Sequence, residues 1–533
     1  MKRLLPAAID VMLCLGICLA YAGTPAPEVN ESHYLIKARH FWNSTFAQND
    51  LFVVSADAHW FFFSMMGWLT HSFSLPTSAW LGRLLIWLSL AIGWRHLARG
   101  VVSHSFIGIL TFPAFLGAVE LGQVSGEWVV GGFEAKGMAY ALLFAAIGEA
   151  LRDRWKWSWV LLGFASAFHV VVGGWVTLTC LLAFAICKGG IAIFNRSWRS
   201  QWLWLIAGGC ISLAGLLPAL RLNRGIPADV ASMAAHIYVY DRLPHHLSPL
   251  HFSIDRWTHH IVWLILVGTS YGLFQGSILT PSNRSSFSKI NTLWVLGITA
   301  FFIAFLGLII DLYGLYHPKI PASLLRFYWF RWNDVAFPIA IVMLIAQWCF
   351  SPIESSWRRN LAWSLILIPS SLWLADRTLI QWNQVIPEAD CRSLLMPNED
   401  EEQEHQTYQD WIAVCGWIQS NTPNDALFIT PRYQQSFVWY SHRAEVVNWK
   451  NVPQDATSML EWRERMRAVY PYATTGGLIP NNAKSLRSLA TRYGAQYAVL
   501  DRRVYYQLPR LPIVYPRGSQ RNQTYVVVEL PSR

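Results

Sequence analysis

Long apolar runs dominate the pattern of this chain. A helix of about 20 apolar residues crosses the hydrocarbon core of a bilayer, which is about 30 Å thick. The clear candidates for such spans are residues 5–22, 78–95, 103–119, 130–150, 201–220, 261–280, 291–311, 333–350 and 359–375. The pattern therefore predicts a mainly α protein whose helices cross a membrane many times.

The apolar run from 157 to 187 is too long for one ordinary span. Basic residues stand at both of its ends: Arg152, Arg154 and Lys156 before it, and Lys188, Arg196 and Arg199 after it. Because lysine and arginine favour cytoplasmic loops, both ends are expected on the cytoplasmic side, joined by two short helices that turn near Gly173 and Gly174. The prediction becomes a bundle of about 11 spans.

The charges of the short loops also orient the bundle. With the N-terminus in the cytoplasm, the remaining basic loops all face the same side. They carry Arg95, Arg99, Arg284, Lys289, Arg358 and Arg359. We therefore expect a multi-pass protein of the inner (plasma) membrane whose segments 23–77, 221–260 and 376–533 are extracytoplasmic.

The first 22 residues resemble a secretory signal, and Ala20 and Ala22 resemble a cleavage site. Asp10 interrupts their apolar stretch, and many more spans follow. These two features favour a first membrane helix over a cleaved signal.

Composition agrees with a membrane protein. The chain is 53% hydrophobic, only 14% charged, and contains 29 tryptophans. Its net charge of +10 is scattered beside apolar runs rather than gathered into one patch, which argues against nucleic acid as a partner. Cys391 and Cys415 lie in the polar C-terminal part, where a disulfide is one of two open alternatives.

The C-terminal segment 376–533 predicts a small α/β domain, separate from a membrane domain over 1–375. The β-rich runs are "ALFIT", "AEVVNW", "QYAVLD" and "TYVVVEL", and helical runs such as "SMLEWRERMRAV" and "AKSLRSLATRYG" alternate with them. The acidic tract "NEDEEQEHQ" is expected to be a solvated loop. The domain contains no glycine-rich phosphate loop.

Two outer segments are rich in ionisable residues. In 23–77, Glu31, Asp57 and His59 stand among aromatics, and the short run "AHWFFFSMMGWL" predicts an interfacial helix. His33, Lys37 and His40 are expected to form a solvated stripe on a helix. The segment 221–260 carries six histidines whose spacing matches no closed metal motif, so it is interpreted as a loop over a substrate entrance.

Further candidate residues lie at the predicted mouths of spans. In "GGFEAKGMAY", Lys136 is expected to snorkel to the interface, whereas Glu134 is a candidate functional group. His169 lies just before the expected turn. Arg326 and Arg331 form either a phosphate clamp or an aromatic belt with an ion pair, in which Asp334 neutralises Arg331 along the helix.

The stretch "NESHYLIKAR" resembles a motif of the GT-C superfamily of integral-membrane glycosyltransferases, Asp-Glu-x-x-Tyr-x-x-x-Ala-Arg. Glu31, Tyr34, Ala38 and Arg39 match it, and Asn30 departs from it. "WIQSNTPNDALFITPRYQQSFVWYSHRAEV" is similar to the start of the outer domain in these proteins. "GGFEAKGMAY" and "VVNWKNVPQDA" look like stretches from an uncharacterised bacterial membrane family of this type.

The resemblance implies an enzyme that moves a sugar from a polyprenyl-phosphate carrier to an acceptor at the outer membrane face, in contact with membrane lipid. It implies Glu31 as general base, Asp57 as a second acid or metal ligand, and Arg331 as the residue that holds the carrier phosphate. The substrate-binding candidates are Tyr34, Arg39, His59, Glu134, His169, Arg326 and Arg331. A divalent metal stays open, with Glu31, Asp57 and His59 as candidate ligands, because Asn30 is neutral where the motif has a carboxylate.

Two other functions fit the same pattern. A transporter or flippase of a lipid-linked or polar substrate also uses ionisable groups in a membrane, but such groups usually lie near the midplane of internally repeated halves. No such repeat is visible in this sequence. A catalytically inactive GT-C relative with a binding or assembly role is the second alternative, and the presence of Glu31 weighs against it.

Overall fold

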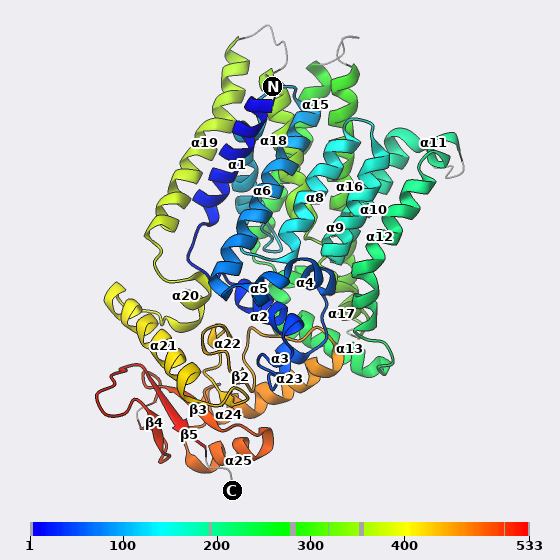
Figure 1. Ribbon diagram of the computed structural model, residues 1–533. Coiled ribbons are helices and arrows are strands. Elements are labelled where there is room, and N and C mark those ends of the chain that lie inside the picture. Colours follow the sequence, from blue (N-terminus) through cyan, green and yellow to red (C-terminus); the bar gives the residue numbers. More distant parts are fainter. Residues whose placement is uncertain are drawn as a thin grey trace. The chain divides into compact units, whose positions relative to one another are not determined.

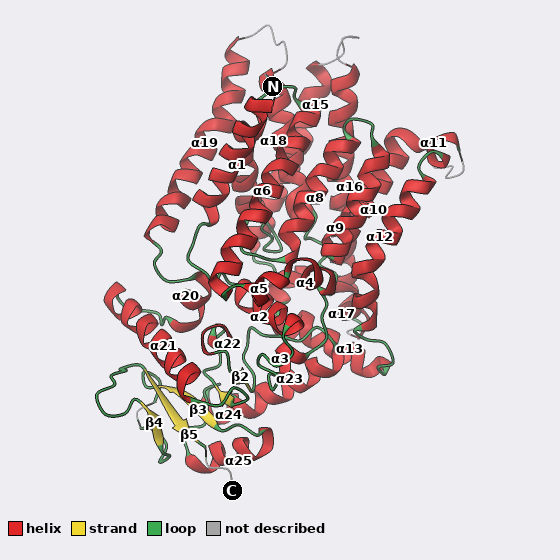
Figure 2. Cartoon of the chain, in the orientation of Figure 1, coloured by secondary structure: helices red, strands yellow, loops and turns green. Residues whose placement is uncertain are grey.

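The computed structural model describes residues 4–190, 195–277, 284–317, 319–350, 356–505 and 507–530. Within these ranges the chain is mainly helical, and its strands form one sheet in the C-terminal part (Figure 2). Internal contacts divide the chain into two compact units. The helical unit comprises Met1–Gly23, Arg83–Leu220 and Ala235–Asn383, and the mixed unit comprises Thr24–Gly82, Arg221–Ala234 and Gln384–Arg533.

Each predicted span overlaps a helix, and residues 278–280 of the predicted span 261–280 lie outside the described residues. The helices are α1 (Leu4–Ala22), α6 (Leu75–Val101), α7 (Ile107–Gly122), α8 (Ala135–Ala150), α9 (Trp155–Phe168), α10 (Val170–Phe184), α12 (Trp202–Arg221), α15 (Ile254–Ser277), α16 (Arg284–Gly314), α18 (Asn333–Phe350) and α19 (Ser356–Asn383). Figure 1 shows many of them running alongside one another, and α18 packs on α7, α15, α16 and α19.

Six stretches of the described chain are long and apolar enough to cross a membrane. They are Leu4–Ala22, Leu75–Val101, Val170–Lys188, Trp202–Arg221, Ser288–Gly314 and Asn333–Phe350. A multi-pass membrane protein is therefore confirmed, whereas the count of 11 spans stays a prediction.

The break inside the run 157–187 falls at His169, not at the glycine pair. His169 ends α9 and caps α10, where its Nδ1 accepts a hydrogen bond from the Val172 backbone N–H at 3.3 Å. Gly173 serves packing instead, because a Cβ there would collide with the backbone of Ser166 on α9. The two short helices form as predicted, but a side-chain cap rather than glycine flexibility makes the turn.

Glycines also bring α9 and α12 into backbone contact. A Cβ on Gly208 would collide with the Trp159 carbonyl, and a Cβ on Gly215 with the Ala167 carbonyl. Small residues of this kind let membrane helices approach closely and gain dispersion energy where no hydrophobic effect drives association.

Asp10, the charged residue inside the first apolar run, is completely buried. Its carboxylate lies 3.1 Å from Arg95 Nε and accepts hydrogen bonds from the backbone N–H groups of Gly108 and Ile109 at the start of α7. A buried carboxylate is stable there because it meets both a cation and the positive end of a helix dipole. Asp10 is therefore a packing element that joins α1, α6 and α7.

The segment 221–260, interpreted as a loop, is largely helical. It contains α13 (Ala228–His236), a π-helix (Ile237–Arg242), α14 (Pro244–Leu247), a 3₁₀ turn (Pro249–His251) and the beginning of α15. Most of α13 belongs to the mixed unit. The other short helices of the helical unit are α11 (Arg196–Arg199), a π-helical turn (Ala185–Gly189) and α17 (Lys319–Leu325).

The mixed unit combines the first long segment with the C-terminal α/β part. Its helices are α2 (Glu31–Trp42), α3 (Leu51–Val54), α4 (Trp60–Met66), α5 (Trp68–Ser72), α20 (Glu388–Leu394), α21 (Glu401–Asn421), α22 (Phe437–Ser441), α23 (Ala456–Val469), α24 (Tyr472–Thr475) and α25 (Ala483–Tyr493). Its strands are β1 (Leu427–Ile429), β2 (Ala444–Glu445), β3 (Tyr497–Asp501), β4 (Ile513–Tyr515) and β5 (Tyr525–Glu529), in the order β2-β1-β3-β5-β4.

The sheet matches the four predicted strands and adds β4. β1 pairs in parallel with β2 and β3, whereas β5 pairs antiparallel with β3 and β4. Pro512 and Pro516 stand beside β4 and weaken its sequence signal, because proline lacks the N–H that a ladder needs. β4 is tolerated because it lies at the edge of the sheet.

The prediction of a loop for the acidic tract is wrong. α21 begins at Glu401, inside the tract, and Asp400 caps it. The Asp400 carboxylate accepts from the Gln403 N–H at 2.9 Å, and the Gln403 side chain accepts from the Asp400 N–H at 3.1 Å. Acidic residues in the first turn then meet the positive end of the helix dipole, so the charge run stabilises a helix start.

The first segment packs on the C-terminal part within the mixed unit. The Glu445 N–H donates to Asp50 Oδ2 at 3.1 Å, and the Ala56 N–H donates to Asp455 Oδ2 at 3.3 Å. α2 is buried on most of its surface, Lys37 included. The predicted solvated stripe on this helix is therefore wrong at Lys37, because neighbouring elements of the same unit cover it.

The cysteines are all free in the described structure, so Cys391 and Cys415 are not joined. Cys415 is buried in α21, and Cys391 lies half-buried in α20.

Candidate functional site

Glu31, the predicted base, is the first residue of α2 and is completely buried. Its Oε2 accepts a hydrogen bond from the Glu28 backbone N–H at 2.9 Å. Asn30 is the N-cap residue, but its side chain makes no capping bond. The N-terminal end of a helix favours negative charge, so the fold supplies a local reason for a buried carboxylate at this position.

Tyr34 lies one turn after Glu31 on α2 and meets His59. The Tyr34 hydroxyl and His59 Nε2 are 2.9 Å apart, and their rings lie at a centroid distance of 5.1 Å. His59 is the N-cap residue of α4. The structure thus brings together two substrate-binding candidates that are 25 positions apart in the sequence.

Asp57 is held against α2 by Lys37. Lys37 Nζ lies 3.2 Å from Asp57 Oδ1 and donates to the backbone carbonyls of Phe52 and Ser55 at 3.0 and 2.7 Å. Burial lowers the pKa of Lys37, and the neighbouring Asp57 opposes that change. The second predicted carboxylate therefore lies in an ion pair, and the lysine that makes it was missed as surface.

Asn30, where the sequence motif breaks, also has a lysine partner. Lys450 Nζ donates to Asn30 Oδ1 at 3.0 Å. Lys450 is half-buried and follows β2, so the C-terminal part supplies a cation to the first residues of the motif helix.

Arg39, the last matching residue of the motif, contacts a different set of groups. Its guanidinium lies over the Phe46 ring, 5.3 Å from the centroid. Burial lowers the pKa of Arg39. Phe46 also packs against His442, whose pKa is lowered to about 4 by burial and by the charges of Arg39 and Arg443.

The candidate metal ligands do not form a metal site in the described residues. Asp57 pairs with Lys37, His59 bonds to Tyr34, and Glu31 accepts from the Glu28 backbone. No three His, Cys, Asp or Glu side chains converge on one point in the part of the chain that the structure describes. The donor set around α2 therefore does not fit a bound divalent cation in this arrangement.

A second cluster of ionisable residues lies inside the helical unit, centred on Glu127. Arg331 Nε lies 2.7 Å from Glu127 Oε2, while Lys136 Nζ lies 3.4 Å from Glu127 Oε1. The Tyr140 hydroxyl donates to Glu127 Oε1 at 3.0 Å. A carboxylate with two cations and a phenol is stable when buried, because each of its charges has a partner.

Glu134 joins the same cluster. Its Oε1 accepts from Trp128 Nε1 at 2.9 Å and lies 3.9 Å from Lys136 Nζ. The ammonium of Lys136 also lies over the Trp128 ring, 3.1 Å from the centroid. The prediction that Lys136 snorkels to the interface is wrong, because its side chain is only 5% exposed and has two carboxylate partners.

The sequence spacing predicted that Asp334 neutralises Arg331, but the structure shows that it does not. Its carboxylate instead accepts from the backbone N–H groups of Val124 and Ser125 at 3.0 and 2.9 Å, and from the Ser125 hydroxyl at 2.7 Å. Arg331 pairs with Glu127 and lies over the Tyr328 ring. Helical spacing offered Arg331 a neighbour three residues away, but the tertiary fold supplied a closer one.

Arg326 lies outside this cluster. It is half-buried, lies 5.9 Å from the centroid of the Phe327 ring, and makes no ion pair among the described residues. Burial lowers the pKa of Arg326. Among the described residues, no carboxylate compensates this desolvation.

Comparison with known proteins places this chain among distant neighbours. Residues 409–469 match a family model described as a domain of unknown function (DUF6798). No curated protein matches the chain.

Solved structures similar to this chain include AglB and ArnT, both membrane glycosyltransferases of the GT-C superfamily. The oligosaccharyltransferase AglB from Archaeoglobus fulgidus, in complex with an inhibitory peptide and a dolichol-phosphate, is 11% identical over 94% of this chain and 69% of its own, with a TM-score of 0.43. ArnT from Cupriavidus metallidurans is 14% identical in the apo state, over 98% of this chain and 97% of its own, with a TM-score of 0.41. ArnT bound to undecaprenyl phosphate is 13% identical over 99% and 98%, with a TM-score of 0.35. Similarities this low assign no residue a role.

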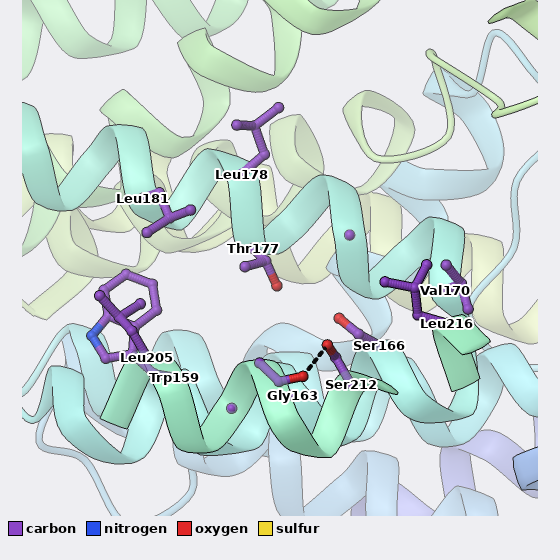
Figure 3. Close-up of a pocket in the computed structure, with 13 residues that line it drawn as sticks. Trp159, Gly163, Ser166, Val170, Thr177, Leu178, Leu181, Leu205, Ser212 and Leu216 are labelled. Atoms are coloured by element: carbon purple, nitrogen blue, oxygen red, sulfur yellow. Dashed lines mark hydrogen bonds between the residues drawn. The ribbon is translucent and has the colours of Figure 1, made fainter. Parts of the chain in front are cut away.

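A cavity of about 390 Å³ lies between α9, α10 and α12 in the helical unit. Figure 3 shows Thr177 and Leu181 on the side of α10 that faces Trp159 of α9 and Leu205 of α12. Two of its hydroxyls bond within their own helix: Thr177 donates to the Gly173 carbonyl, and Ser212 to the Gly209 carbonyl. The lining contains no charged residue and none of the candidate site residues, so it offers a phosphate no cation.

Four residues of the two clusters escaped sequence reasoning: Lys37, Lys450, Glu127 and Tyr140. Glu127 had a readable signal, since it stands in the glycine-rich and aromatic stretch "SGEWVVGGFEAK", seven positions before Glu134. Lys450 stands in "VVNWKNVPQDA", a stretch already noted for its resemblance, but nothing in the sequence pairs position 450 with position 30.

Proposed function

We propose that this chain is an integral-membrane glycosyltransferase, which moves a sugar from a polyprenyl-phosphate carrier to an acceptor at the outer face of the membrane. Glu31 acts as general base on the acceptor hydroxyl. The observation that carries the proposal is the position of Glu31: a fully buried carboxylate at the first residue of the motif helix, one turn before the Tyr34–His59 pair. Proton removal by a positioned carboxylate contributes about 10²- to 10⁴-fold to rate.

The other residues around α2 have supporting roles in this proposal. Asp57, held by Lys37, is the second acid, and the Tyr34 hydroxyl and His59 bind the sugar or the acceptor. Arg39 is a binding residue at the far end of the motif. Side chains held by fixed partners lose little entropy on binding, which favours a precise site.

The carrier phosphate is assigned to arginines of the helical unit. Arg326, which has no carboxylate partner among the described residues, is the first contact, because its planar fork of donors matches phosphate oxygens. Arg331 and Glu134 contribute to carrier binding through the ion cluster around Glu127. His169 caps α10 at the break between α9 and α10.

The proposal includes a topology. The chain crosses the inner membrane with about 11 helices, the N-terminus is cytoplasmic, and the C-terminal α/β part is periplasmic. Basic residues at helix ends, such as Arg99 in the last turn of α6 and Arg284 at the start of α16, support this orientation.

The test is sugar transfer by Glu31→Gln in membrane vesicles supplied with polyprenyl-phosphate-linked sugars. The variant keeps its fold, measured by its elution and melting temperature in detergent, and loses transfer by about 10²- to 10⁴-fold. Glu402→Gln, at an exposed position of α21, is the matched control and retains full transfer. Transfer by Glu31→Gln at the rate of the control would refute the assignment.

A further inference from the structure

Two lysine ammonium groups lie close to oxygen atoms of the residues on and around α2 that a divalent cation would use. Lys450 Nζ is 3.0 Å from Asn30 Oδ1, and Lys37 Nζ is 3.2 Å from Asp57 Oδ1. Both lysines and all their partners belong to the mixed unit. One lysine comes from α2 itself and the other from the segment after β2.

From these contacts we propose that Lys37 and Lys450 supply the positive charge of this site in place of a divalent metal, and that the site does not require one. The proposal rests on the proposed function for its meaning, since it says how a transferase site at α2 is charged. Its physical content, which cation the site binds, can be tested separately.

Geometry and charge support the proposal together. A divalent cation binds carboxylate and amide oxygens at about 2.0–2.6 Å. A cation on Asn30 Oδ1 would therefore lie within about 5.6 Å of the Lys450 ammonium, and like charges at that distance repel strongly. The same conflict arises at Asp57, where Lys37 is buried and has three backbone carbonyls as further partners.

The residue types agree with this substitution of cations. Where the sequence motif has a carboxylate, this chain has the neutral Asn30, whose amide oxygen accepts well from an ammonium. Two ammonium groups carry the same total charge as one divalent ion. Because they are covalently attached, they stay in the site when metal is removed.

Lys450 is the lysine that contacts substrate in this proposal. It is half-buried, whereas Lys37 is only 6% exposed and is held by several acceptors. An anionic group of the bound substrate, of the phosphate class, would meet Lys450 first. Lys37 would instead position Asp57 and α2.

The experiment is Mn²⁺ binding to the full-length chain in detergent, after treatment with a chelator, followed by electron paramagnetic resonance. The expected result is that the wild-type protein shows no stoichiometric Mn²⁺ site. The double variant Asn30→Asp with Lys450→Met restores the carboxylate and removes the competing charge, so it binds Mn²⁺ at least about tenfold more tightly. Lys484→Met, at an exposed position of α25, is the matched control and behaves as wild type.

One equivalent of Mn²⁺ bound by the wild type and lost in Asp57→Asn would overturn the proposal, whether or not the double variant folds. The binding measurement needs no substrate, so failure of the proposed function, seen as absence of sugar transfer, is a separate result. Where transfer is present, the proposal also requires that it persist in chelator.

Discussion

Lys37 Nζ lies 3.2 Å from Asp57 Oδ1, and this ion pair joins the middle of α2 to the segment before α4. Lys37 is three residues after Tyr34, so the two side chains share a face of the helix. Tyr34 bonds to His59, two residues beyond Asp57. One face of α2 therefore holds both Asp57 and His59 in place.

Lys37→Met is expected to destabilise the mixed unit. The change leaves the Asp57 carboxylate without its cation and the Ser55 carbonyl without its lysine donor, at a cost of about 1–3 kcal/mol. Thermal unfolding in detergent measures the loss as a lower melting temperature. Lys484→Met removes an exposed lysine of the same unit and is the control, and equal melting temperatures for the two variants would contradict the burial argument.

Glu127→Gln is expected to destabilise the helical unit by more. It removes the shared partner of Arg331 and Lys136 and leaves two buried cations poorly compensated, which costs about 3–5 kcal/mol. The measurement is the melting temperature of the full chain in detergent, with Glu402→Gln as the exposed control. A variant as stable as this control would show that Glu127 does not stabilise the buried Arg331 and Lys136.

Gly208 and Gly209 form a matched pair on α12. A Cβ at Gly208 would collide with the Trp159 carbonyl of α9, whereas a Cβ at Gly209 would have nothing within 4 Å. Gly208→Ala is therefore expected to separate α9 from α12 and lower the melting temperature. Gly209→Ala is expected to be neutral or to stabilise by up to about 1 kcal/mol, because alanine is the better helix former. The reverse order would refute the close packing of α9 on α12.

Glu445 is expected to make the stability of the mixed unit depend on pH. Burial and then the neighbouring Asp50 carboxylate raise the pKa of Glu445 above its ordinary value of 4.5. Between the ordinary pKa and the raised pKa of Glu445, the folded state binds more protons than the unfolded state. The contribution of Glu445 to stability is therefore greatest at low pH and falls as pH rises through this interval.

Melting temperatures of Glu445→Gln and wild type, compared from about pH 5 to about pH 9, test this sign. The difference between wild type and variant should shift against the wild type as pH rises, because glutamine does not titrate. A difference that is constant across this range would show that Glu445 is already ionised in the fold.

Much of the helical unit could be predicted from local pattern. The apolar lengths and basic flanks identified the long helices, including the pair α9 and α10 inside one long run. The turn between that pair was misplaced because Gly173, which looked like a hinge, is required for contact with Ser166 on another helix. A glycine in the sequence is compatible with a flexible hinge and with close helix packing, and the sequence alone does not distinguish the two.

The candidate site divides in the same way. The motif identified Glu31, Tyr34 and Arg39 because their spacing on one helix is a local property. It could not identify Lys450 or predict that Glu127 would replace Asp334 as the partner of Arg331. Those pairs join positions that are far apart in the sequence.

By itself, the sequence determined that this is a multi-pass membrane protein with a C-terminal α/β part and a carboxylate at the start of its first motif helix. Apolar run length, strand periodicity and short motifs are local, and they report directly on secondary structure and burial. Only the tertiary structure decided which charges meet, with Lys37 on Asp57, Lys450 on Asn30 and Glu127 between Lys136 and Arg331. A buried charge must find a partner, but which partner is nearest depends on how the chain folds back on itself.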